Sequence, residues 1–200
     1  MDNLRVTWEC PRPDLLGISQ HGEMAISLDW HNFYDWMAKG TLAVAPLSGG
    51  APHALLADVC DGDIATDGKN LAIVPCSGAM ETLEFPIGNI LFKTSGWVSI
   101  PRISPAGDAI AFLEHPLLGD DRGYVSIVDM KGQKKRVTEE WAGEDGLAWS
   151  AANDEIWFTS SSRTEPQSLR ASIARAGSAL SFPPLRNSLS GTSERLAVSC

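Results

Sequence analysis

The sequence lacks several features that would assign it to a class at once. No run approaches eighteen apolar residues, so no transmembrane helix is expected, and the opening Met1–Arg5 lacks the apolar stretch of a secretory signal. Basic residues are also few: 16 Lys and Arg stand against 25 Asp and Glu, which gives a formal net charge of −9. Nucleic-acid backbones and anionic membranes reward clustered positive charge, so neither is expected as the main partner.

Closely spaced cysteines and catalytic motifs are missing as well. The four cysteines, Cys10, Cys60, Cys76 and Cys200, contain no Cys-x-x-Cys pair, which argues against zinc and redox motifs. We interpret them as separate buried thiols in preference to a disulfide, and they leave the redox compartment open. The chain holds no Gly-x-Ser-x-Gly elbow, no phosphate-binding Gly-x-x-x-x-Gly-Lys loop and no kinase catalytic loop. We therefore expect no enzyme activity, no cofactor and no metal.

A short phrase that does occur four times organises the chain. It reads apolar-x-Ser/Thr, a tight turn, one or two polar residues and a short apolar strand, and its turns centre on Gly22, Gly68, Gly107 and Asn153. Glycine, with asparagine as its usual substitute, supplies the positive φ that such turns need. The copies recur at intervals of about 43 residues, a period that four-stranded propeller blades share with helical HEAT or armadillo repeats.

Composition within the repeat favours strands over helices. The segments between the turns are short, β-branched or aromatic, and interrupted by Gly and Pro, whereas helical repeats need uninterrupted 3.6-residue periodicity. We predict an all-β fold of four-stranded antiparallel sheets. The predicted strands cover residues 41–47, 53–59, 83–87, 90–94, 98–104, 109–114, 124–130, 134–138, 146–150, 155–159 and 168–173.

The third copy carries a family resemblance. Ser104–Phe112, which reads Ser-Pro-Ala-Gly-Asp-Ala-Ile-Ala-Phe, followed by Val125–Asp129, resembles the repeat of TolB-like, WD-repeat-like β-propellers. The stretch Leu83–Ser160 is similar to the propeller half of bacterial, notably acidobacterial, serine/threonine protein kinases. The resemblance covers roughly residues 14–175. It implies a sensor or protein-interaction module, which would be extracytoplasmic if it is linked to such a kinase; otherwise the compartment stays open.

The two ends do not fit the repeat. We expect residues 1–13 to provide an outer strand of a preceding or closing blade, residues 14–175 to form the blades, and residues 176–200 to be an irregular tail. Three complete blades and the inner part of a fourth fit either a fragment of a larger ring or a closed four-bladed ring, and we favour the fragment. An incomplete ring would expose apolar edges and favour a homodimer.

Two segments contain candidate binding residues. The loop from Glu114 to Gly123 gathers charge, and the insertion Asp29–Met37 is rich in aromatic residues. The alternatives are a solvated hairpin, in which Arg122 pairs with an acid, and a long hairpin folded onto the blade edge. The candidate ligand- or partner-binding residues are Glu114, His115, Asp120, Asp121, Arg122, Trp30 and Trp36.

Trp97, Trp141, Trp149 and Trp157 are expected in the core. Trp149 falls on an inner strand and Trp157 on a second strand, where large rings fill the space between blades. The expected function is therefore a non-catalytic module that binds a protein partner or a small ligand on a propeller face. The alternative is the lid domain of a prolyl-oligopeptidase-type serine hydrolase.

Overall fold

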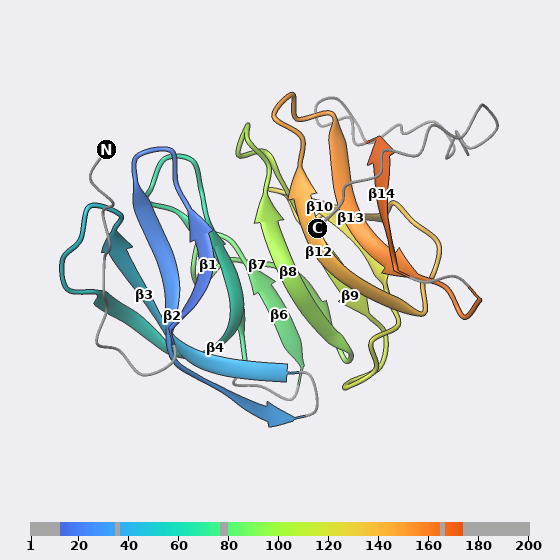
Figure 1. The fold of residues 1–200 in the computed structure, drawn as a ribbon, viewed down its shortest axis with the longest axis horizontal. Helices are drawn as coiled ribbons and strands as arrows, with labels where there is room; N and C mark the ends of the chain where they lie inside the picture. Colours follow the sequence, from blue (N-terminus) through green and yellow to red (C-terminus); the bar gives the residue numbers. More distant parts are fainter. Residues whose placement is uncertain (1–12, 35–36, 77–79, 165–166, 174–200) are drawn as a thin grey trace, which may run out of the picture.

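The computed structural model describes residues 13–34, 37–76, 80–164 and 167–173. Every regular element in this part is a β-strand, so it contains no helix that could cross a membrane. All pairings between the strands are antiparallel, and the sheets stand side by side around a common centre (Figure 1). The expected outer strand within residues 1–13 and the expected tail at 176–200 lie, apart from Pro13, outside the described residues.

The first two sheets, which we call blades 1 and 2, share one bent strand. In order from the centre outward, blade 1 consists of β1 (Asp14–Ile18), β2 (Glu23–Tyr34), β3 (Met37–Pro46) and the first half of β4 (His53–Ile64). Blade 2 consists of the second half of β4 with β5 (Leu71–Pro75), β6 (Glu81–Glu84) and β7 (Ile90–Thr94). Val59 pairs with Gly40 of β3 on one side and with Pro75 of β5 on the other, so the two blades form one seven-stranded sheet.

Blades 3 and 4 are separate sheets. Blade 3 consists of β8 (Trp97–Ile103), β9 (Ala109–His115), β10 (Tyr124–Asp129) and β11 (Lys134–Arg136). Blade 4 consists of β12 (Gly143–Trp149), β13 (Glu155–Ser161) and β14 (Ser168–Ile173). Figure 1 shows blade 1 at the left, β8 in the middle and blade 4 at the right. Three four-stranded blades and the inner three strands of a fourth agree with the predicted open, partial propeller.

The four repeated turns join the first and second strand of each blade, as predicted. Gly22, Gly68, Gly107 and Asn153 all have positive φ, between 61° and 81°. Each donates its backbone N–H to the carbonyl of the residue three positions earlier, at 2.8–3.1 Å. In blades 3 and 4 a serine hydroxyl completes the turn, because Ser104 and Ser150 each accept two backbone N–H groups and donate to an aspartate. The sequence repeat is thus a geometric repeat.

Apolar side chains fill the spaces between neighbouring blades, where burial of nonpolar surface stabilises the stack. Phe112 is fully buried between blades 2 and 3, with its ring centroid 5.2 Å from that of Phe92. Between blades 3 and 4, Leu113 and Ile127 pack against Ile156 and Phe158. These contacts fix the blades relative to one another.

Two sequence predictions need correction. The fourth strand of blade 1 does not end at Val59: it continues to Ile64 as the inner strand of blade 2, because Asp58, at a φ of 56°, lets the chain bend without a loop. Trp157 does not fill space between blades. It is 41% exposed, because it lies on the face of blade 4 that points away from blade 3. Trp149 does pack against the core between blades 3 and 4, and its indole N–H donates to the Arg102 carbonyl at 2.8 Å.

Candidate functional site

The inner strands of the blades converge on one cavity of about 590 Å³, which we call the hub cavity. Residues of β1, β2, β3, β4, β8, β12 and β13 line it, together with Asp121 and Gln167 from loops. A cavity of this size is in the range of small-molecule sites. It lies where propeller inner strands meet, so it draws on all four blades at once.

Each inner strand is irregular where it borders this cavity. The pairing register shifts between Leu15 and Gly17 in β1, between Val59 and Asp61 in β4, between Ser99 and Arg102 in β8, and between Asp145 and Leu147 in β12. Such bulges redirect side chains and are frequent beside functional sites. In β8 the irregularity places Ile100 at a φ of 50°, which is a rare backbone conformation for a β-branched residue.

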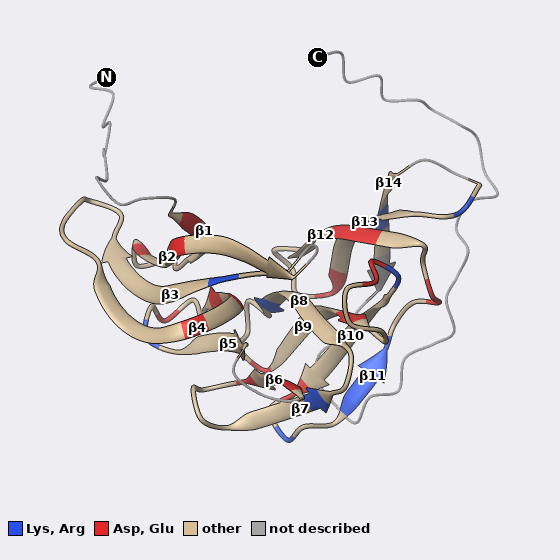
Figure 2. Cartoon of the chain, turned by 90° about the horizontal axis from the view of Figure 1, so that it is seen from below, with Lys and Arg blue, Asp and Glu red and all other residues tan. Residues whose placement is uncertain are grey.

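One wall of the hub cavity is acidic. Asp121, Glu144 and Asp145 line it from blade 4 and the loop beside it (Figure 2, red on β12). Glu144 is only 5% exposed, and neither of its carboxylate oxygens has a hydrogen-bond partner. Desolvation, reinforced by the nearby charge of Asp121, raises the pKa of Glu144 to about 8. Desolvation, then the charges of Asp145 and Asp120, also raises the pKa of Asp121.

The opposite wall is apolar. Trp30 of β2 and Met37 and Ala38 of β3 line it from blade 1, and Trp97 of β8 adds a further aromatic surface to the cavity. The hairpin of β2 and β3 reaches the cavity because both strands are long, at 12 and 10 residues. Trp30 is half-buried there, whereas Trp36, the other tryptophan of the predicted insertion, lies outside the described residues.

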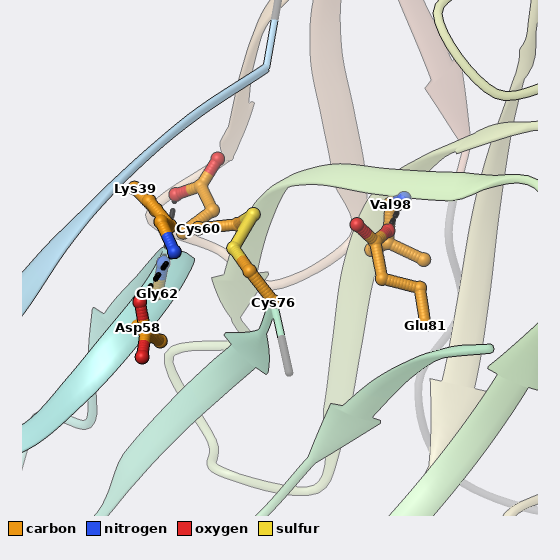
Figure 3. The surroundings of a disulfide bond; sticks show 8 residues. Lys39, Asp58, Cys60, Gly62, Cys76, Glu81 and Val98 are labelled. Atoms are coloured by element: carbon orange, nitrogen blue, oxygen red, sulfur yellow. Dashed lines mark hydrogen bonds and ion pairs between the residues drawn. A yellow bond between two sulfur atoms is a disulfide. The ribbon is translucent and has the colours of Figure 1, made fainter. Parts of the chain in front are cut away.

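Three carboxylates of blade 2 hold the inner strand of blade 3. Asp61 accepts the Ile100 N–H at 2.7 Å, and Asp63 accepts the Ile103 N–H at 2.8 Å. Glu81 accepts the Val98 N–H (Figure 3). Burial raises the pKa of all three carboxyls, to about 6 for Asp63 and about 7 for Glu81. These acids have structural partners, which distinguishes them from Glu144.

The prediction of separate cysteine thiols is wrong for one pair. Cys60 and Cys76 form a disulfide with a Cα–Cα distance of 5.5 Å, close to the ion pair of Lys39 with Asp58 (Figure 3). Their 16-residue separation spans the β4–β5 hairpin, which brings the two cysteines together although no sequence motif joins them. Cys60 lines the hub cavity.

The side chains of the charged loop, which were predicted to form one site, lie in different surroundings. Glu114 turns to the outer strands: Lys134 lies 2.7 Å and Arg136 2.9 Å from its carboxylate, and Ser126 donates to it at 2.6 Å. Desolvation would raise the pKa of Glu114, but the hydrogen bonds from Arg136, Lys134 and Ser126 outweigh it and lower the pKa to about 2.

His115 is fully buried and stacks on Trp97, with ring centroids 3.8 Å apart. Its Nδ1 lies 3.2 Å from the Arg122 carbonyl, which can only accept, so Nε2 accepts from the Ser99 hydroxyl at 2.9 Å. Burial lowers the pKa of His115 to about 4, so the ring is neutral at pH 7.

The side chains of the remaining loop residues have different partners and positions. Arg122 forms an ion pair with Asp120 two residues away, as in the solvated-hairpin alternative. Asp121 points to the cavity side, where it joins Glu144. Of the five predicted loop residues, only Asp121 therefore lines the hub cavity.

Sequence analysis missed Glu144, Asp145 and Asp61. They lie on inner strands that are far apart in sequence, and the bulges interrupt the alternation that would have marked them as inward-facing. A signal was available: Asp14 and Asp145 each stand about eight residues before a repeated turn, the position of the inner strand.

Solved structures similar to this chain define its class. No protein-family model and no curated protein matches the sequence. A protein assigned as TolB from Agrobacterium tumefaciens superposes with a TM-score of 0.59 at 17% identity, over 83% of this chain and 62% of that one. A puromycin-hydrolyzing peptidase from Mycobacterium tuberculosis gives a TM-score of 0.51 at 14% identity, over 82% of this chain and 29% of that one. The chain thus spans less than two thirds of the length of either protein.

The fold is that of a β-propeller, open and partial. Its fold is similar to that of a protein assigned as TolB, which confirms the coarser, fold-level part of the sequence resemblance. At these identities the likeness concerns the fold alone.

Proposed function

We propose that this chain is a non-catalytic binding module that takes a ligand, or a segment of a protein partner, into the hub cavity. The observation that carries the proposal is the convergence of four blades on one cavity with an apolar and an acidic wall. Rigid scaffolds that present such a concave, mixed surface are the usual setting of ligand recognition. The acidic wall also supports a ligand other than nucleic acid.

The bonding of the charged loop argues against a catalytic role for its two buried titratable side chains, His115 and Glu114. Both ring nitrogens of His115 are engaged by Ser99 and the Arg122 carbonyl, and Glu114 is held by two basic residues. A general base needs a free lone pair within reach of a substrate proton. Neither side chain offers one.

Two kinds of larger protein are candidates for containing this module. The sequence resemblance favours a kinase-linked sensor, which would place the module outside the cytoplasm. The likeness to a peptidase of which this chain spans 29% favours the lid domain of a serine hydrolase. The encoding gene distinguishes them by a neighbouring kinase domain or a Gly-x-Ser-x-Gly hydrolase domain.

Binding is tested with capped tripeptides Ac-Ala-Xaa-Ala-NH2 in which Xaa is Lys, Glu, Leu, Phe or Ser. We expect at least one tripeptide to bind by isothermal titration calorimetry, and we expect Trp30→Ala to weaken that binding about tenfold, because Trp30 forms part of the cavity wall.

Trp157→Ala is the matched control, since it removes a partly exposed indole outside the cavity. It should leave the affinity unchanged. Binding that Trp157→Ala abolishes and Trp30→Ala does not would move the site to the face of blade 4. Absence of binding by every tripeptide at millimolar concentration would exclude a peptide segment as the occupant, and failure of the small-molecule probes described below as well would overturn the proposal.

A further inference from the structure

The hub cavity contains acidic side chains without matching basic ones. Asp14, Asp61, Asp121, Glu144 and Asp145 line it, and no Lys or Arg is among the described residues that do. Asp61 is satisfied by the N–H groups of Ile100 and Gly62. The excess of negative charge is therefore concentrated at the blade 4 wall.

Glu144 is the most unusual of these residues. A buried polar group without a hydrogen-bond partner is costly and rare in folded proteins. Its neighbour His115 cannot serve it, because both ring nitrogens are already bonded. No basic side chain lowers the pKa of Glu144 or of Asp121, so within the described chain their charges have no counterion.

Two glycines make room for these carboxylates. A Cβ at Gly123 would lie 2.9 Å from Glu144 Oε2, and a Cβ at Gly143 would lie 2.8 Å from Asp121 Oδ2. A Cβ at Gly123 would also lie 2.8 Å from the Glu114 carbonyl oxygen, whereas the two carboxylate oxygens are the ends of flexible side chains. The glycines thus leave open space beside the two acids, whose closeness has an electrostatic cost that a bound cation would offset.

The apolar wall opposite the two acids indicates which chemical group the rest of a cationic ligand would have. Trp30, Met37 and Ala38 offer an apolar surface on the same cavity, with Trp97 between the two walls. An aromatic or alkyl stem would pack there while its charged end reaches Glu144 and Asp121. No group of three or more potential metal ligands converges within the described residues, so a metal ion is not the cation that this geometry favours.

We propose that the hub cavity binds an organic monocation, a protonated amine or a guanidinium on an apolar stem, with Glu144 and Asp121 as its counter-charges. This inference rests on the proposed function of the hub cavity as the binding site. The cation is either a free amine or a Lys or Arg side chain of a protein partner, since both present the same chemistry.

Calorimetry with four probes tests the inference. 2-Phenylethylamine carries charge and stem, 2-phenylethanol carries the stem alone, methylammonium carries the charge alone, and calcium chloride supplies a metal ion. At pH 8 we expect 2-phenylethylamine to bind at least about tenfold more tightly than the other three, because only it can use both walls.

The variant Glu144→Gln removes the charge and keeps the shape. It should weaken 2-phenylethylamine about tenfold and leave 2-phenylethanol unchanged. Glu139→Gln, the same change at an exposed position, should alter neither affinity. Circular dichroism and the melting temperature establish that both variants are folded.

Each other outcome overturns the inference in a recognisable way. Equal affinity for 2-phenylethylamine and 2-phenylethanol, while tripeptides still bind, would show that the cavity does not select a cation. The proposed function would then stay intact. Preferential binding of calcium would replace the organic cation by a metal ion. Failure of all probes and all tripeptides would remove the binding site itself. If the inference holds, the relative affinities identify the source of the cation. Tighter binding of Ac-Ala-Lys-Ala-NH2 than of 2-phenylethylamine indicates a side chain of a protein partner, and the reverse order indicates a free amine.

Discussion

Glu144 shows how much a single buried carboxyl can influence this molecule. In the unfolded chain it titrates near 4.5, whereas burial and the charge of Asp121 raise its folded pKa to about 8. Between these values the folded state keeps a proton that the unfolded state has released. Its contribution to stability is complete below about pH 4.5 and is lost as pH rises toward 8. Glu81 and Asp63 act in the same direction, with folded pKa values of about 7 and about 6.

Glu144→Gln should therefore stabilise the protein only at higher pH. We expect the free energy of unfolding, measured by urea denaturation, to change by less than about 0.5 kcal/mol at pH 4 and to rise by at least about 2 kcal/mol at pH 8, since one pKa unit corresponds to about 1.4 kcal/mol. Glu139→Gln serves as the control and should reproduce the wild-type pH dependence. An equal effect of Glu144→Gln at both pH values would show that the carboxyl does not carry the raised pKa.

The repeated turns are the elements whose sequence requirement is most clearly conformational. A Cβ at Gly107 would meet no heavy atom within 4 Å, so only its φ of 71° opposes a side chain. Gly107→Ala should lower the free energy of unfolding by about 1 kcal/mol, because alanine is strained in the left-handed region. Asn153→Gly, at the equivalent turn of blade 4, should change it by less than about 0.5 kcal/mol, since asparagine already tolerates a φ of 61°. Urea denaturation of both variants measures the difference, and a neutral Gly107→Ala would contradict this account of the repeat.

The same turns explain why strands were predictable from the sequence and the cavity was not. A turn and the apolar alternation after it are local, so β8 to β11 begin within one residue of the predicted positions. The hub cavity depends on packing: Glu144 and Trp30 are far apart in the chain and meet the same cavity only once four blades surround it. Local alternation also led to the wrong prediction for Trp157. The alternation of side chains along a strand indicates which residues face a neighbouring blade, but it does not indicate whether such a blade is present.

At the scale of the whole molecule, the stack of described blades has an exposed face at blade 4. Ala111 of β9 is fully buried beneath blade 4, and Trp157 occupies the corresponding position on β13, four residues after the turn. Trp157 pairs with Ala148 and Ala171 in its own sheet, and Leu169 on β14 is 65% exposed. This face of blade 4 carries apolar side chains of the kind that pack between blades, although no described blade covers it.

We expect this face to mediate self-association in solution. An exposed indole flanked by small residues buries nonpolar area when a second copy packs against it, which favours association. Light scattering coupled to size-exclusion chromatography should show a mass that rises with protein concentration. Trp157→Lys should weaken the association at least about tenfold, because a central tryptophan commonly dominates an interface. Leu117→Lys introduces the same charge at another exposed apolar position and should have no effect. A constant monomer mass for the wild type at all concentrations would instead show that this face needs no partner.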